Sequence, residues 1–141
     1  MAVASYHGIS PVADPNLIEI GYGDWESLYI DQIPSLGWAE EYSKFRDDPV
    51  NHRPPNGETI DEILKRVRIS LDSVRTIHSE ESICMVGHSG SIRAILTLAL
   101  AGTHNTWARL KLKNAALSEI TFDHNSAKLS VERVNDFSFL N

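Results

Sequence analysis

Cysteine is almost absent from the sequence, with Cys84 the single example in 141 residues. One cysteine excludes both a disulfide framework and a cysteine-rich zinc site within one chain. Because Cys84 lies inside the apolar run 83–86, we expect its thiol to be buried.

Long hydrophobic runs are missing as well. No stretch approaches the roughly 20 apolar residues that span a bilayer, and the first residues lack a basic region followed by an apolar core. We therefore expect a cytoplasmic protein with no membrane partner.

Basic residues are scarce, because 13 Lys and Arg stand against 19 Asp and Glu and give a formal net charge of -6. Nucleic-acid-binding domains usually concentrate Lys and Arg on one face. We expect no nucleic-acid partner. An acidic chain can still bind a small anionic metabolite where local positive groups meet.

The length suits one compact domain, which we place at residues 1–141. Apolar and turn patterns predict helices over 38–46, from Thr59 onward and over 92–101, a strand over 82–87, and a hairpin of strands 115–123 and 128–134 joined by a turn at 124–126.

The helix that begins at Thr59 has the clearest signals. Thr59 and Glu62 have the spacing of a capping box. A continuous apolar stripe follows: Ile60, Ile63, Leu64, Val67, Leu71 and Val74. We interpret the opposite face as solvated; it holds Lys65, Arg68, Asp72 and Arg75.

The junction 87–91, Gly-His-Ser-Gly-Ser, lies between the predicted strand 82–87 and the next helix. Ligands of open α/β sheets bind just beyond the carboxyl ends of strands, and a helix N-terminus attracts anions. His88 could donate to a phosphoryl oxygen while the amides of Ser89 and Gly90 stabilise developing charge. The alternative is a structural histidine that ends a strand.

A serine nucleophile is a competing interpretation of the same junction. Gly87-x-Ser89-x-Ser91 differs by one residue from the Gly-x-Ser-x-Gly elbow of serine esterases. The acid and histidine of a triad would have to be Asp123 and His124, which are adjacent in a predicted turn and poorly placed for that role. An esterase site at Ser89 is therefore the least favoured hypothesis.

Three segments together resemble the histidine phosphatase, or phosphoglycerate-mutase-like, superfamily. Residues 83–93, Ile-Cys-Met-Val-Gly-His-Ser-Gly-Ser-Ile-Arg, resemble its second histidine signature. Residues 17–26, Leu-Ile-Glu-Ile-Gly-Tyr-Gly-Asp-Trp-Glu, are similar to its segment Leu-x-Glu-x-x-Phe/Tyr-Gly-x-Trp-Glu. Residues 45–59 resemble its loop with Asp-Pro and Pro-Gly-Gly-Glu-Ser. The segments occur in the family's order and cover essentially the whole chain.

This resemblance implies a three-layer α/β/α sandwich that lacks its first strand and the helices after it. It also implies transfer of a phosphoryl group from a small phosphomonoester to a histidine. The group then passes to water, as in a hydrolase, or to another hydroxyl, as in a mutase (an isomerase). The implied chemistry needs no metal and no other cofactor.

The resemblance assigns two catalytic residues, Glu19 as the general acid and His88 as the histidine that stabilises the transferring phosphoryl group. It implies phosphate and substrate binding by Ser89, Gly90, Tyr22 and Glu58. Each has a plainer alternative: Glu19 as an exposed loop carboxylate, Glu58 as a charge favourable near a helix N-terminus, and Tyr22 as a packing residue.

The family's attacking histidine belongs to an Arg-His-Gly tripeptide, which the 141 residues do not contain. Tyr6-His7-Gly8 is the nearest match but has tyrosine in place of arginine. Residues 6–12 match better the end of the helix that precedes the acid segment, so we interpret His7 as a helix-end residue. We expect the isolated chain to be impaired or inactive.

A missing central strand would expose an apolar face and unpaired edges. We therefore expect either a homodimer or a complementing N-terminal segment as partner. The alternative function is a non-catalytic remnant that binds a phosphorylated ligand or a partner chain.

Overall fold

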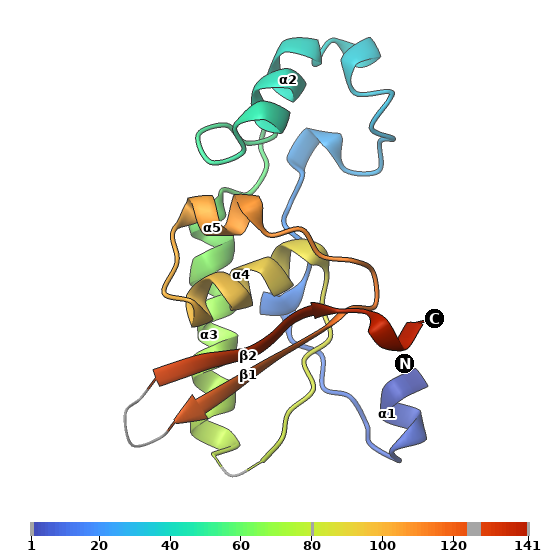
Figure 1. Ribbon diagram of the computed structural model, residues 1–141. Coiled ribbons are helices and arrows are strands. Elements are labelled where there is room, and N and C mark those ends of the chain that lie inside the picture. The colour runs from blue at the N-terminus through green and yellow to red at the C-terminus, as the bar shows by residue number, and fades with distance from the viewer. Residues whose placement is uncertain (1, 80, 124–127, 141) are drawn as a thin grey trace.

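The computed structural model describes residues 2–79, 81–123 and 128–140. Within these ranges the chain forms five helices, a two-stranded hairpin and short 3-10 turns. Figure 1 shows how they are arranged. The helices are α1 (Ala2–Tyr6), α2 (Ala39–Asp47), α3 (Ile60–Ile77), α4 (Ser89–Ala99) and α5 (His104–Arg109). The strands are β1 (Leu117–Asp123) and β2 (Lys128–Asp136), and the 3-10 turns are η1 (Pro15–Leu17), η2 (Gly23–Trp25), η3 (Pro34–Leu36) and η4 (Ser138–Leu140).

Helix α3 begins as predicted, with Thr59 as its N-cap. The Thr59 hydroxyl accepts the Glu62 N–H at 3.2 Å, and Glu62 Oε2 accepts the Thr59 N–H at 2.7 Å. This reciprocal pair satisfies two N–H groups that the first turn leaves without helical partners. The predicted apolar stripe is confirmed: four members are buried, Ile60, Ile63, Val67 and Leu71, and two are half-buried, Leu64 and Val74.

The core forms where α4 and α5 pack on α3. Its buried members are Ile20, Ile60, Ile63, Val67, Leu71, Ala94, Ile95 and Trp107. The Trp107 indole N–H donates to the Gly90 carbonyl at 3.0 Å, which ties α5 to the start of α4. Burial of these side chains is the main stabilising contribution in this region.

The predicted C-terminal hairpin is confirmed as an antiparallel pair of β1 and β2, with Thr121 opposite Ser130. Side chains of β1 alternate between exposed and half-buried, as expected for a strand with one covered face. Arg75, which we expected to be solvated, is half-buried with its guanidinium 3.9 Å from the centre of the Phe122 ring. The predicted turn 124–126 lies outside the described residues.

The segment from η2 to α2 projects from the end of the body where α5 lies (Figure 1). The predicted helix 38–46 is confirmed as α2. Trp25 is 4% exposed and lies edge-on to the rings of Tyr42 at 5.8 Å and Phe45 at 5.6 Å. This aromatic cluster fixes the projecting segment onto the loop that follows Glu19.

The prediction of a buried strand at 82–87 is wrong for this structure. The described residues of this segment form no strand, Val86 is 74% exposed, and the Cys84 thiol is exposed rather than buried. A strand needs hydrogen-bonding neighbours, and no described segment pairs with this one. The apolar composition of residues 82–87 is typical of a buried strand, but no described segment forms the neighbouring strand that it would need.

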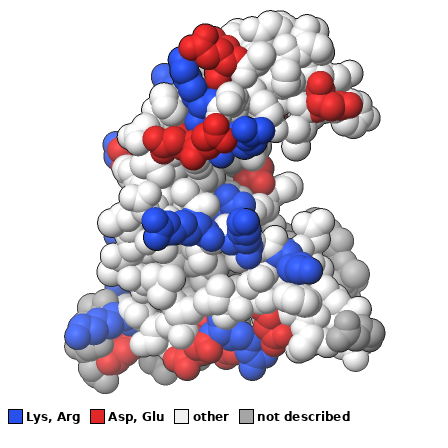
Figure 2. All heavy atoms as spheres, turned by 45° about the horizontal axis from the view of Figure 1, so that its top comes forward, with Lys and Arg blue, Asp and Glu red and all other residues white. Residues whose placement is uncertain are grey.

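The structure places His7 at the end of α1, as expected, where the Ile9 N–H donates to the Ala4 carbonyl at 2.9 Å. Gly8 follows with a positive φ of 65°, typical of a helix C-terminus. No helix in the described ranges is long and apolar enough to cross a membrane. Figure 2 shows acidic and basic side chains interspersed, with a band of basic ones across the body beneath the projecting segment.

Candidate active site

Hydrogen bonds between the Ser91 hydroxyl and the His88 backbone hold the first turn of α4, and the His88 side chain is exposed. His88 is the N-cap residue with φ -97° and ψ 172°. Its N–H donates to Ser91 Oγ at 3.1 Å, and the Ser91 hydroxyl donates to the His88 carbonyl at 3.1 Å. Ser91 is fully buried. Within the described part of the chain the imidazole has no hydrogen bond, so it is free to meet a ligand.

The Glu19 carboxylate lies on the same helix N-terminus. Glu19 Oε1 accepts the Gly90 N–H at 2.7 Å and the Ile20 N–H at 2.8 Å. Both bonds end on one oxygen, and Oε2 has no hydrogen bond to any described residue. The structure thus brings the Glu19 carboxylate into contact with Gly90, which lies two residues after His88. The arrangement leaves one carboxyl oxygen available to hold or move a proton.

Glu58 is occupied by protein partners. Arg66 donates to it in a fork, from Nε to Oε1 at 2.6 Å and from Nη2 to Oε2 at 2.8 Å. Glu58 Oε2 also accepts the Gly21 N–H at 3.1 Å, and Glu58 lies just before the N-cap of α3. Its side chain is 17% exposed. These contacts favour a residue that organises the loop after Glu19.

Sequence reasoning missed Arg66, which orders the segment leading into Glu19. Its Nη1 donates to the carbonyls of Asn16 at 2.6 Å and Ile18 at 3.0 Å, and its Nη2 donates to the Glu19 carbonyl at 3.0 Å. One available signal was its position three residues after Ile63, on the apolar side of α3. A charged residue there indicates a buried partner.

Two backbone hydrogen bonds join the loop after Glu19 to the loop before α3. The Glu58 N–H donates to the Gly21 carbonyl at 2.8 Å, and the Asp24 N–H donates to the Pro55 carbonyl at 2.9 Å. Gly23 has φ 56°, and a Cβ there would lie 2.2 Å from Pro55 O. A glycine is required because both the conformation and the close approach exclude a side chain.

Tyr22 combines packing with proximity to the acid. Its ring lies edge-on to Phe45 at 6.3 Å. Burial raises the pKa of the Tyr22 hydroxyl above its usual value, the Glu19 carboxylate raises it further, and the Arg93 guanidinium partly opposes both effects. The ring contact with Phe45 confirms packing by Tyr22, and substrate contact by Tyr22 stays a prediction.

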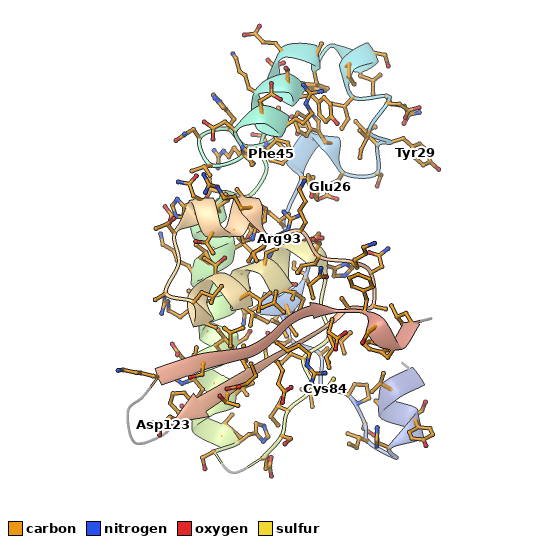
Figure 3. All side chains as sticks on the ribbon, viewed as in Figure 1. Glu26, Tyr29, Phe45, Cys84, Arg93 and Asp123 are labelled. Atoms are coloured by element: carbon orange, nitrogen blue, oxygen red, sulfur yellow. The ribbon has the colours of Figure 1, made fainter. Side chains whose placement is uncertain are left out.

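The structure offers little for a serine esterase. The Ser89 hydroxyl is exposed and makes no hydrogen bond to any residue the structure describes. Figure 3 shows Asp123 at the far end of the hairpin, away from Arg93 and the first turns of α4. The histidine of that hypothesis, His124, lies outside the described residues.

Metal-ligating side chains are not grouped in the described ranges: no three His, Cys, Asp or Glu residues are placed to hold one ion. The candidate site consists of a carboxylate, an imidazole and backbone N–H groups at a helix N-terminus. Such groups can bind an anion and move a proton.

Known proteins resemble most of this chain in sequence. A bifunctional protein of Mycobacterium tuberculosis is 32% identical over 129 residues, which are 92% of this chain and 35% of that protein. A Hydrogenobacter thermophilus protein named as phosphoserine phosphatase 2 is 26% identical over 130 residues, 92% of this chain and 63% of its own length. The chain thus spans roughly one third to under two thirds of these relatives.

Solved structures share the fold. YhfR of Bacillus stearothermophilus superposes with a TM-score of 0.87 at 21% identity, covering 99% of this chain and 68% of YhfR. This likeness confirms the predicted phosphoglycerate-mutase-like α/β fold. The model of the histidine phosphatase superfamily (branch 1) matches residues 1–136. The chain therefore belongs to the histidine phosphatase superfamily.

Proposed function

We propose that this chain contributes the acid and the stabilising histidine to a phosphomonoester hydrolase of the histidine-phosphatase type. The observation that supports it most is the hydrogen bond from the Gly90 N–H to Glu19 Oε1 at 2.7 Å. It joins the proposed acid to the helix turn that presents His88. Residues of both proposed roles thereby lie at one helix N-terminus, a position that attracts anions.

In this proposal an attacking histidine nitrogen forms a bond to phosphorus as the bond from phosphorus to the ester oxygen breaks. Glu19 protonates the departing oxygen through Oε2, and Oε1 stays bound to the two N–H groups. His88 and the Ser89 amide stabilise the charge on the equatorial oxygens. The Gly90 amide, which we expected to bind phosphate, is instead bound to Glu19 Oε1. Water then attacks phosphorus, returns a proton to Glu19 and releases phosphate and the histidine.

The substrate class in this proposal is small phosphorylated metabolites. Relatives bear the names of phosphatases and of phosphoglycerate mutases. Water as the acceptor gives hydrolysis, and a second hydroxyl as the acceptor gives the mutase outcome. We favour hydrolysis, in keeping with the phosphatase names among the structural relatives.

Binding of inorganic phosphate, measured by calorimetry on the full chain, tests the site even without an attacking histidine. His88→Ala should weaken binding about tenfold or more, as expected for a lost hydrogen bond to a charged group. His78→Ala is the control, because His78 pairs with Glu81 at the end of α3. Equal binding by both variants would contradict the proposed function. Turnover of p-nitrophenyl phosphate, if present, should likewise fall in His88→Ala alone.

A non-catalytic role is the second candidate function. The exposed apolar segment 82–87 favours it, because Ile83 and Val86 are 41% and 74% exposed. In this case the chain would bind a phosphorylated ligand or a partner chain without turnover. Phosphate binding that depends on His88, together with no hydrolysis even after addition of a complementing Arg-His-Gly segment, would favour this role.

A further inference from the structure

A groove lies where α3 passes the end of α4 and the start of α5. It has a volume of about 510 Å³, within the range of roughly 300–1,000 Å³ that is typical of small-molecule sites. Figure 1 shows these parts of the three helices side by side. The α4 residues of the groove are Thr97 and Leu98. About 12 Å of helix, at 1.5 Å per residue, separates Thr97 from Ser89 in the first turn of α4. The groove is therefore distinct from the candidate active site.

Much of the lining of the groove is apolar and only partly covered. Val50, Leu64 and Leu98 line it, pack on the core and remain half-buried. Thr97 is buried, and its hydroxyl donates to the Arg93 carbonyl at 2.8 Å, so that hydroxyl has its proton engaged within the helix. Contact with this lining would stabilise the apolar part of a ligand.

Two basic side chains of α3 also line the groove and have no acidic partner. Lys65 and Arg68 are exposed and lie one turn apart. Neither forms an ion pair within 4.0 Å or a hydrogen bond with any residue that the structure describes. The acids beside them have other partners: Glu62 accepts the N–H of the N-cap residue at 2.7 Å, and Asp72 pairs with Arg75 at 3.2 Å. The two cations are therefore available to bind an anion.

Asp61 is the acidic residue among the described residues that line the groove, and it too is paired. Its Oδ1 lies 2.8 Å from His104 Nε2, at the start of α5. This contact holds the start of α5 beside α3. Two cations, Lys65 and Arg68, thus stand against one carboxylate, so the lining carries a single net positive charge when His104 is neutral. Such a lining suits a ligand with one negative charge better than a dianion.

We propose that this groove is a second ligand site, which binds a small aliphatic carboxylate. The carboxylate of the ligand would lie at Lys65 and Arg68, and its chain would cover Leu64 and Leu98. A purely polar anion would leave the apolar lining in water, and a neutral aliphatic molecule would leave the cations without a partner. The inference is independent of the proposed function, because the described residues that line the groove are not those of the candidate active site.

The plainer alternative is a groove filled by water, with Lys65 and Arg68 solvated separately. In that case an alkyl chain would bind weakly at any exposed apolar surface, and the charge of its head group would make no difference. The two interpretations therefore differ in the charge that the ligand must carry.

Titration of the full chain, followed by NMR of its backbone amides, tests the inference with three probes: octanoate, octylammonium and acetate. Octylammonium keeps the chain and reverses the charge, whereas acetate keeps the carboxylate and lacks the chain. We expect octanoate to bind about tenfold more tightly than either. The amide signals of residues 64–68 and 97–105 should shift, and those of residues 82–90 should not.

Lys65→Gln combined with Arg68→Gln should weaken octanoate binding about tenfold. Because both side chains are exposed and unpaired in the described structure, their replacement should not disturb the core. Arg109→Gln combined with Lys111→Gln is the matched control: it removes two charges from exposed positions outside the groove and should leave octanoate binding unchanged. His88→Ala should also bind octanoate as the wild type does.

Equal binding of octanoate and octylammonium, or equal losses in the two double variants, would overturn the inference. Amide shifts confined to residues 82–87 would place the probe on the exposed apolar segment and would also overturn it. Loss of octanoate binding in His88→Ala would assign the probe to the candidate active site instead. None of these results bears on phosphate binding at His88, so the proposed function stands or fails separately.

Discussion

A methyl group at position 90 would lie 2.2 Å from Glu19 Oε1 and 3.1 Å from Ile20 Cγ2. Gly90→Ala must therefore displace the carboxylate from the turn of α4. We expect a loss of about 1–3 kcal/mol in the free energy of unfolding, the usual cost of overpacking, and weaker phosphate binding. Urea unfolding and calorimetry measure the two effects.

Gly21→Ala is the control for that prediction. Its Cβ would lie 3.5 Å from the Glu58 Cβ, an ordinary contact, and its backbone N–H would remain. We expect a change within about 0.5 kcal/mol, as for substitutions that create no cavity or clash. Similar losses in both glycine variants would show that Gly90 has no special relation to Glu19.

Arg66 provides the second residue-scale prediction. Arg66→Met leaves the Glu58 carboxylate, 17% exposed, without its cation and three backbone carbonyls without their donor. Breaking a largely buried pair in this way should cost about 3 kcal/mol. Chemical unfolding measures the loss, and Arg68→Met, on the exposed face of the same helix, should change little.

A double substitution separates pairing from general damage. If Arg66 and Glu58 act as a pair, Arg66→Met and Glu58→Gln together should cost clearly less than the sum of the single losses. Additive losses would mean that the two residues stabilise the loop independently.

Residues in a recognisable local segment can be identified from the sequence, whereas contacts between distant segments cannot. Glu19 and His88 could be proposed from the sequence because each lies within a recognisable local segment. Arg66 was missed because its partners at Asn16, Ile18 and Glu19 are distant in sequence.

At the scale of elements, Asp14 fastens the segment before Glu19 to α3. Its Oδ2 accepts the Ser70 hydroxyl at 2.6 Å and its Oδ1 accepts the Asn16 N–H at 2.8 Å. The Ser70 hydrogen bond, more than the Asn16 contacts, lowers the pKa of Asp14, although burial opposes the shift. A lowered carboxyl pKa contributes stability above the unfolded-state value, about pH 3.9, which is lost as the pH falls through the folded-state pKa.

Ser70→Ala should therefore destabilise the chain at pH 7, and its effect should shrink as the pH falls through the folded-state pKa of Asp14. Urea unfolding at a series of pH values measures this trend. Ser73→Ala, on the exposed side of α3, should show no such dependence. A Ser70→Ala effect that is constant or grows with acidity would contradict the assignment to Asp14.

Elements that depend on local interactions were predicted well. The start of α3 follows from Thr59 and Glu62, three residues apart, and the hairpin from two alternating strands close in sequence. The segment 82–87 was predicted wrongly because a strand is stable only beside another strand. Its apolar residues are typical of a strand buried between neighbours, but no described segment supplies such a neighbour.

At the scale of the whole molecule, the exposed segment 82–87 predicts association. Ile83 and Val86 expose apolar surface beside backbone groups that have no strand partner among the described residues, a combination that favours pairing with another chain. We expect the mass from light scattering to exceed the 15.7 kDa of one chain and to rise with protein concentration. Phosphate binding need not change with it.

Val86→Lys should return the mass toward that of one chain, because a charged edge disfavours strand pairing. Ile69→Lys is the control, since Ile69 is 60% exposed on α3 but lies outside this segment. Cys84 reports on the same surface: its thiol should react with a disulfide reagent more slowly as the chain associates and at a constant rate in Val86→Lys. A one-chain mass at every concentration, with Cys84 equally reactive throughout, would show that segment 82–87 is not a pairing surface for a second copy. A complementing N-terminal segment would then be the remaining candidate partner of segment 82–87.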